Sequence, residues 1–166
     1  PFRPFTIAGR FLHIGRYGKD ADDGRMYPMF IGYPSLVRGY DIGSFNNIEC
    51  GNSPFGCPIV DQMFGSRIMV ASMELRFPLF GVLGLGGGYY GILPVEAGLF
   101  YDAGVAWTGT EGVQVFGNGP RQVLHSAGAS FRMNLFGFAI GQMDVVHPFQ
   151  RPTKDWLVRF SLTPAF

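Results

Sequence analysis

The chain has 166 residues, which is enough for one domain with a hydrophobic core, and its net charge of +1 gives no indication of a nucleic-acid partner. Hydrophobic residues make up 47% of the chain and the mean hydropathy is +0.16, which is high for a chain with 15% charged residues. The 17 phenylalanines and 25 glycines favour strands and tight turns over helices.

The longest uncharged segment, from Phe77 to Val95, is long enough to cross a bilayer as a helix. Glycines crowd it, however, and Pro78 and Pro94 lie close to its ends, so we interpret it as a glycine-rich connection. A membrane location then requires a closed β-barrel, because only helices and closed barrels satisfy every backbone polar group in lipid.

Alternation of apolar with polar or small side chains predicts six strands. It is clearest between Pro94 and Trp107, where Leu99 and Tyr101 share one face and Asp102 lies on the other. The expected strands are Arg3–Tyr17, Gly65–Pro78, Pro94–Trp107, Gln122–Asn134, Phe138–His147 and Asp155–Phe166. A long loop, residues 18–64, separates the first two.

These segments run for about ten residues or more, which exceeds the usual strand length in soluble sheets. Such alternation, with aromatic residues such as Trp107 near strand ends, is typical of a transmembrane barrel. A soluble β-sandwich with one buried face is the alternative. Membrane barrels begin at about eight strands, so further strands are needed from a longer chain or another subunit. The chain begins at Pro1 without an initiating Met or a signal peptide, as expected of a piece of a longer chain.

The long loop contains an arginine in apolar and aromatic surroundings. Arg38 is the one charged residue between Met26 and Tyr40, and a buried charge requires a partner. Glu74 and Asp102 lie within the second and third expected strands, on their polar faces. Their carboxylates are the candidate acceptors, and the pairing predicts a loop that folds back into the lumen of a barrel.

Two cysteines, Cys50 and Cys57, flank a turn-rich segment of the same loop. Their spacing is consistent with a local disulfide, which would indicate an oxidising compartment. Two free thiols are the alternative.

No residue pattern indicates catalysis, a metal or a cofactor. His13, His125 and His147 have no ligand spacing, and the G-x-S-x-G nucleophile signature is missing from the sequence. The segment from Gly86 to Gly91 fits G-x-G-x-x-G, but no helix pattern follows it, so a turn is favoured over phosphate binding. We therefore expect a non-enzymatic protein with no cofactor and no metal.

Four segments carry recognisable motifs in a fixed order. They are V-R-G-Y at residues 37–40, M-E-L-R-F-P at 73–78, F-x-D-x-G-x-x-W at 100–107 and S-x-G-x-x-x-R at 126–132. Together they resemble the C-terminal barrel region of the outer-membrane assembly-factor superfamily, which contains BamA, TamA, the two-partner secretion transporters and the bacterial surface antigen family. The resemblance covers essentially the whole chain, residues 1–166.

The resemblance implies that Arg38, with Gly39 and Tyr40 at the loop tip, contacts both Glu74 and Asp102 and anchors the loop inside the lumen. A paired cysteine couplet in this loop also occurs in some relatives.

The resemblance further implies a C-terminal β-signal that assembly machinery reads. Its residues here are Trp156, Val158, Phe160, Leu162 and Phe166. Ser161 and Pro164 depart from the preferred Gly and apolar residue of that signal. We expect Pro164 to weaken pairing, because proline cannot donate a ladder hydrogen bond.

The implied fold is an all-β, antiparallel transmembrane barrel in the outer membrane of a Gram-negative-type bacterium, with this chain forming the last six of about sixteen strands. The implied function is insertion or translocation of proteins, or movement of lipid, at that membrane. The alternative is a passive outer-membrane anchor that displays or docks a partner. Implied partners are outer-membrane lipid, the missing N-terminal strands or other subunits, and protein substrates or complex partners, with no nucleic acid.

Overall fold

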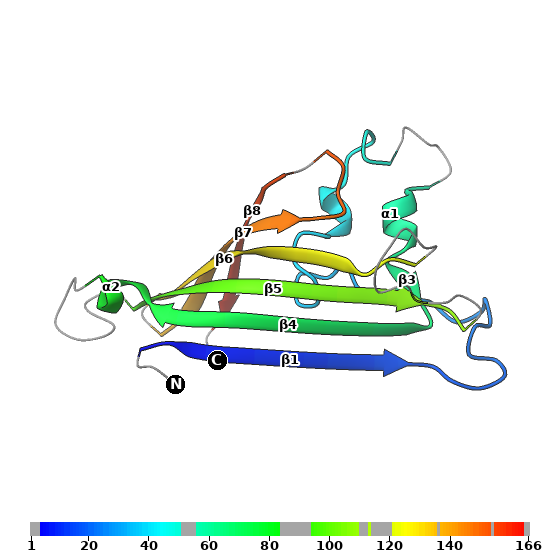
Figure 1. Cartoon of the computed structure of the whole chain (residues 1–166), viewed down its shortest axis with the longest axis horizontal. Helices are drawn as coiled ribbons and strands as arrows, with labels where there is room; N and C mark the ends of the chain where they lie inside the picture. The colour runs from blue at the N-terminus through cyan, green and yellow to red at the C-terminus, as the bar shows by residue number, and fades with distance from the viewer. Residues whose placement is uncertain are drawn as a thin grey trace.

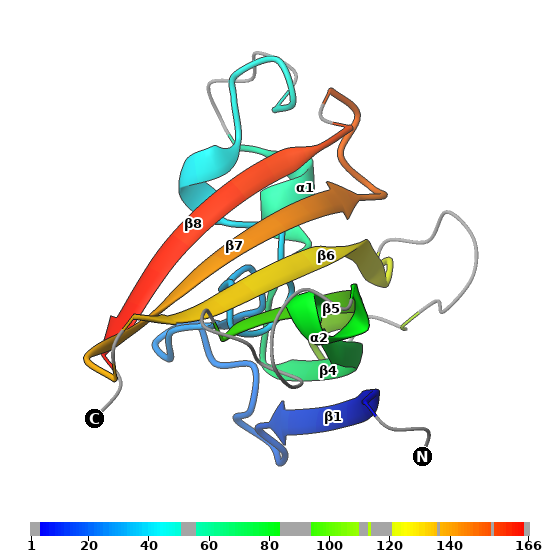
Figure 2. The same cartoon turned by 90° about the vertical axis from the view of Figure 1, so that its left-hand side faces the viewer.

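A computed structural model describes residues 4–50, 56–83, 94–109, 113, 121–135, 137–153 and 155–164. Its main feature is an open antiparallel sheet in the order β1-β4-β5-β6-β7-β8 (Figure 1). The strands are β1 (Thr6–Gly15), β4 (Arg67–Pro78), β5 (Val95–Trp107), β6 (Leu124–Leu135), β7 (Ala139–Pro148) and β8 (Leu157–Pro164). The fold is therefore all-β and antiparallel, and the sheet is curved but not closed, with β1 and β8 at its two edges (Figure 2).

All six expected strands are present, and the first is shorter at both ends than the sequence indicated. The first ends at Gly15 rather than Tyr17, because the chain then turns through Gly18, whose φ of +116° few other residues adopt. The last is described as far as Pro164, which is paired with Ala139 and has no N–H to donate to the ladder. Phe166 lies outside the described residues.

The connection between β1 and β4 contains short elements that the sequence analysis did not predict. They are β2 (Met29–Phe30), the 3-10 helix η1 (Ile42–Ser44), α1 (Pro58–Asp61) and β3 (Phe64–Gly65). β2 and β3 pair with each other and bring the two ends of this long loop together. The connection after β4 opens with α2 (Leu79–Val82). Among the helices of the described residues, none has the length and apolarity needed to cross a membrane.

The sheet has two chemically different faces, as the alternation indicated. On the inner face, the register places Ser72 opposite Asp102 and Ser130 opposite Asp144. The outer face carries exposed apolar side chains on β1, β4, β5, β7 and β8, including Ile7, Phe11, Met73, Leu99, Met143, Val158 and Phe160. An apolar outer face opposite a polar inner face is the pattern of a membrane barrel wall.

The long loop packs on the inner face of the sheet and forms the hydrophobic core there. Loop residues Ile31, Val37, Tyr40 and Met63 lie against Ile68, Val70, Ala106 and Leu124 of strands β4, β5 and β6. All eight are 3% exposed or less, so the loop is bound to the sheet by buried apolar area as well as by polar contacts. The core thus holds the polar tip of the loop in one position against the strands.

Candidate functional site

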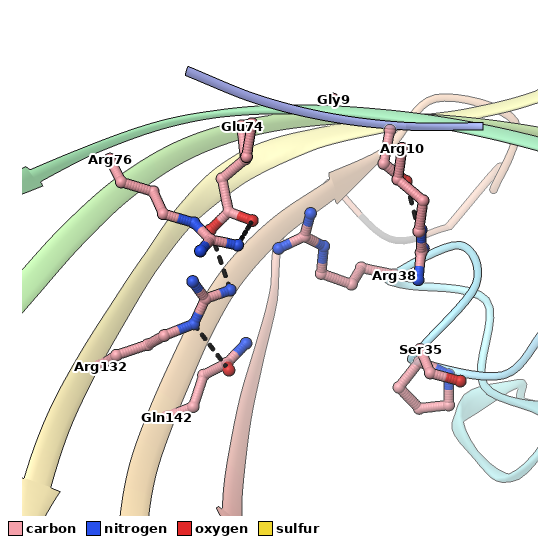
Figure 3. Close-up of a pocket in the computed structure, with 11 residues that line it drawn as sticks. Gly9, Arg10, Ser35, Arg38, Glu74, Arg76, Arg132 and Gln142 are labelled. Carbon is pink, nitrogen blue, oxygen red and sulfur yellow. Dashed lines mark hydrogen bonds and ion pairs between the residues drawn. The ribbon is translucent and has the colours of Figure 1, made fainter. Parts of the chain in front are cut away.

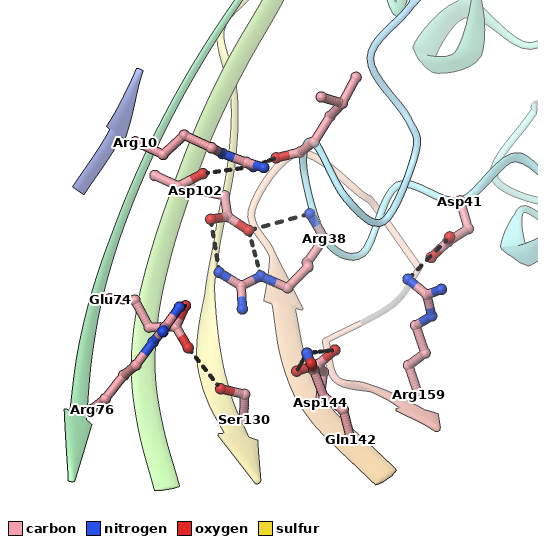
Figure 4. Close-up of polar contacts among 12 residues, drawn as sticks. Arg10, Arg38, Asp41, Glu74, Arg76, Asp102, Ser130, Gln142, Asp144 and Arg159 are labelled. Carbon is pink, nitrogen blue, oxygen red and sulfur yellow. Dashed lines mark hydrogen bonds and ion pairs between the residues drawn. The ribbon is translucent and has the colours of Figure 1, made fainter. Parts of the chain in front are cut away.

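Arg38 lies on the inner face beside Asp102 of β5 (Figure 4). Its Nε donates to Asp102 Oδ2 at 2.7 Å, its Nη2 donates to Oδ1 at 3.0 Å, and its backbone N–H donates to Oδ2 at 3.3 Å. The guanidinium also lies over the Phe100 ring, 3.4 Å from the centroid. The side chain of Asp102 is only 1% exposed, so this two-pronged pair compensates a charge that water does not reach.

The residues after Arg38 explain why the motif contains Gly and Tyr. Gly39 adopts a φ of +87°, and a Cβ there would lie 2.9 Å from Cγ1 of Val146 on β7. Tyr40 is fully buried, and its hydroxyl donates to the carbonyl of His125 at 2.8 Å and contacts Oε1 of Gln150 at 2.6 Å. Burial raises the pKa of the Tyr40 phenol, which keeps it protonated as a donor. The three residues therefore join the loop to β5, β6 and the β7–β8 connection.

The expected contact between Arg38 and Glu74 is not made, and this corrects the sequence-based expectation. Glu74 pairs instead with Arg132 of β6 at 2.9 Å and with Arg76 of its own strand at 3.1 Å. It also accepts a hydrogen bond from Ser130 at 3.2 Å (Figure 4). The two carboxylate oxygens of Asp102 accept hydrogen bonds from Nε and Nη2 of Arg38. The edge of the guanidinium that faces β5 is therefore already occupied. The single bridge expected across two acids is thus two separate clusters on neighbouring strands.

A second buried ion pair, which the sequence analysis missed, fixes the outer part of the loop. Arg151, between β7 and β8, donates to both carboxylate oxygens of Glu49 at 2.9 and 2.8 Å. It also donates to the Gly39 carbonyl and to the carbonyl and hydroxyl oxygens of Ser44, which engages all five of its N–H groups. Both side chains of the pair are 0% exposed. The hydrogen bonds from Arg151 hold the pKa of Glu49 below its ordinary value of 4.5.

Cys50 and Cys57 are joined by a disulfide in the structure, one residue after Glu49. Of the two states that the sequence left open, the structure contains the bonded one. The bond closes a short segment of seven residues' separation next to the Arg151–Glu49 pair. The disulfide therefore lies beside the part of the loop that the Arg151–Glu49 pair holds.

The loop also reaches the last strand of the sheet. Asp41, directly after Tyr40, lies 3.6 Å from Nη1 of Arg159 on β8, and both side chains are about one-third exposed (Figure 4). Arg159 is directly opposite the buried Asp144 of β7 in the strand register. The Asp144 carboxylate accepts two hydrogen bonds from the Gln142 amide.

The residues expected to form a β-signal lie at the free edge of the sheet. Val158, Phe160 and Leu162 alternate on the outer face of β8 and are 60–71% exposed. Trp156 precedes the strand and is also exposed, while Phe166 lies beyond the described residues. Whether assembly machinery reads this segment stays a prediction.

Each histidine makes a hydrogen bond and lies beside an aromatic ring, and the three do not meet one another. His13 contacts the Ile68 carbonyl and the Tyr17 hydroxyl, His125 contacts the Tyr101 hydroxyl, and His147 contacts the Asp155 carbonyl. In the described ranges, no three His, Cys, Asp or Glu side chains are grouped as a metal site would require.

Two kinds of signal separate the predicted contacts from the missed ones. Arg132 and Glu74 both point to the inner face of the sheet, as strand alternation indicates. Alternation does not indicate that the two side chains meet, because a further strand, β5, lies between theirs. Arg151 and Glu49 lie in irregular loops, and their pairing spans 102 positions of the sequence. A loop has no periodicity from which facing residues can be inferred.

Comparison with known proteins gives one match. The family model described as the Omp85 superfamily domain matches residues 5–163 of the chain. Neither the curated proteins nor the solved structures provide a match. Members of this superfamily are outer-membrane proteins of Gram-negative-type bacteria and organelles, and they are non-enzymatic assembly factors and transporters. The open antiparallel sheet fits a fragment of such a barrel, and its polar inner face fits a lumen. The chain belongs to the Omp85 superfamily.

Proposed function

We propose that this chain forms the C-terminal part of an outer-membrane barrel that inserts or translocates proteins, or moves lipid, at the bacterial outer membrane. Membership of the Omp85 superfamily supports the membrane and the general task. Further strands, from a longer chain or another subunit, close the barrel to about sixteen strands in this proposal. Outer-membrane lipid covers the apolar outer face, and the mechanism involves no covalent chemistry.

The observation that carries the proposal is the loop held on the inner face by Arg38 and Asp102. In a closed barrel this face lines the lumen, so the loop occupies the transport path and supports the wall from inside. Gly39 and Tyr40 fix the path of the loop backbone, and Glu74 forms ion pairs with the neighbouring arginines of the strands. The loop contacts β5, β6, β7 and β8. It therefore links the four strands that lead to the β8 edge of the sheet.

The test uses the complete protein in its own cell. The gene is deleted and complemented with the wild type, with Arg38→Ala, or with Arg25→Ala, whose exposed side chain pairs only with Asp23 in the part of the chain that is described. We expect deletion to lower the amounts of other outer-membrane or secreted proteins. Arg25→Ala should restore them, whereas Arg38→Ala should not, although it still reaches the membrane.

A different outcome favours the passive anchor. If deletion leaves all outer-membrane and secreted proteins unchanged but releases one bound partner from the membrane, the barrel serves as an attachment and the transport proposal is wrong. Quantitative proteomics of the outer-membrane and secreted fractions distinguishes the two.

A further inference from the structure

A cavity of about 460 Å³ with several charged side chains in its lining lies on the inner face beside the anchored loop (Figure 3). Strands β1, β4, β6 and β7 form one side of it and the loop forms the other. Its charged lining consists of four arginines and one carboxylate: Arg10, Arg38, Arg76, Arg132 and Glu74. In Figure 3, Arg76 and Arg132 extend from the strands toward the space that the Arg38 side chain reaches from the loop.

Three of the four arginines that line the cavity already have a carboxylate partner. Asp102 compensates Arg38, and Glu74 is shared by Arg76 and Arg132. Glu96 is also 4.0 Å from Arg132, whereas Arg10 contacts no carboxylate within the described ranges.

Arg10 and Arg76 have guanidinium donors that remain available to a ligand. Arg10 donates to the Leu36 carbonyl at 3.2 Å and to the Ser72 hydroxyl at 3.3 Å, and both acceptors are neutral. Within the described ranges, the buried Nε of Arg76 has no hydrogen-bond partner. An unpaired buried donor is costly, and an incoming anion removes that cost.

We propose that this cavity binds acidic side chains of an extended polypeptide. Guanidinium groups bind carboxylates in two-pronged geometry, and their convergence favours more than one carboxylate in succession. The apolar side chains in the lining are small, Ala8 and Pro34, so no large apolar side chain faces the guanidinium groups. Ser35 and Gln142 supply neutral polar groups for a peptide backbone. This inference rests on the proposed transport function, since it names the class of substrate segment that the lumen recognises.

The test is direct binding to the complete protein purified in detergent. Two fluorescent peptides are compared, one with several glutamates in a Gly/Ser background and one with glutamine at the same positions. We expect the glutamate peptide to bind about tenfold more tightly or better, and its affinity to fall as salt is raised. Arg76→Gln and Arg10→Gln should each weaken binding of the glutamate peptide about three- to tenfold.

Two controls separate loss of the site from loss of the fold. Arg25→Gln removes an exposed arginine of the same long loop that does not line the cavity, and it should leave the affinity unchanged. Arg76→Lys keeps the charge and should recover much of the binding that Arg76→Gln loses. Each variant must also keep the heat-modifiable mobility of a folded barrel and the wild-type protease resistance of the loop.

Equal affinity for the two peptides, or binding unaffected by both arginine variants, overturns the proposal. Competition by inorganic phosphate without any binding of the glutamate peptide also overturns it, because the cavity is then a small-anion site. Lost peptide binding in Arg76→Gln with normal complementation in cells rejects the substrate class while leaving the transport function standing. Normal peptide binding by a protein whose deletion has no transport phenotype rejects the transport function instead.

Discussion

Two buried arginine–carboxylate pairs hold the same loop, and they differ in what they connect. Arg38 joins the loop to a strand through Asp102, whereas Arg151 joins it to the β7–β8 connection through Glu49. The first pair retains slight exposure on the arginine side, and the second has none. Arg151 also uses every N–H group that it has. Both guanidinium groups lie over an aromatic ring, that of Phe100 for Arg38 and that of Phe45 for Arg151.

The difference shows that a recognisable motif need not be the tightest attachment of a loop. The V-R-G-Y tip stands out in the sequence because it meets a regular strand, yet the more deeply buried pair lies between two irregular segments. Removing one partner of a buried pair leaves an uncompensated charge. The free-energy cost of that removal therefore depends more on how deeply the pair is buried than on whether its residues form a recognisable motif. The following experiments test this ranking of the two pairs.

The largest effect is expected from Arg151→Ala. The change leaves the Glu49 carboxylate buried without the Arg151 cation and removes the hydrogen bonds that Arg151 donates to Gly39 and Ser44. We expect the docked loop to lose about 3–5 kcal/mol of stability. Loop proteolysis of the complete protein, followed against temperature, measures it. A resistance profile that matches the wild type would show that this pair contributes little.

Arg38→Ala should have the next largest effect, about 2–4 kcal/mol, because Asp102 is buried but water can approach the arginine side of the pair. Heat-modifiable mobility and protease resistance of the loop measure it. Arg38→Lys should recover only part of the loss, because an ammonium cannot make the two-pronged contact. Unchanged mobility and resistance in Arg38→Ala contradict an anchoring role.

Acid should weaken the Arg151–Glu49 pair, but it should lower the stability of the docked loop by less than Arg151→Ala does. The reason is that a protonated Glu49 keeps its shape and part of its hydrogen bonding. The folded-state pKa of Glu49 lies below its ordinary value of 4.5. Its contribution is therefore complete above pH 4.5 and is lost as the pH falls through the lowered value. The difference in loop stability between the wild type and Glu49→Gln should shrink below pH 4.5, as measured by proteolysis with an acid-tolerant protease. A constant difference down to pH 2 speaks against this linkage.

The smallest effect is expected at the exposed contact between the loop and β8. Asp41→Asn removes an ion pair at 3.6 Å whose side chains are about one-third exposed, so we expect a loss of about 0.2–1 kcal/mol that disappears at high salt. The same loop-stability assay at low and high salt measures it. A loss as large as that of Arg38→Ala would mean that the loop is held mainly through β8.

Strand alternation allowed much of the inner face to be predicted before the structure. Glu74 and Asp102 were assigned to the polar faces of their strands, and the register confirms that they share one face of the sheet. Alternation fixes the face of a side chain but not how far it reaches across neighbouring strands. For that reason the Arg38–Asp102 pair is present, while Glu74 binds Arg132 and Arg76 instead.

The sequence by itself determined the six strands, their two faces and the motifs of the superfamily, because these depend on a period of two and on short contiguous patterns. The tertiary structure alone decided which arginine meets which carboxylate, that Glu49 and Arg151 form the most buried pair, and that four arginines surround one cavity. These pairings join residues far apart in the chain, in loops without periodicity. They are set by the long-range packing of the loop on the curved sheet.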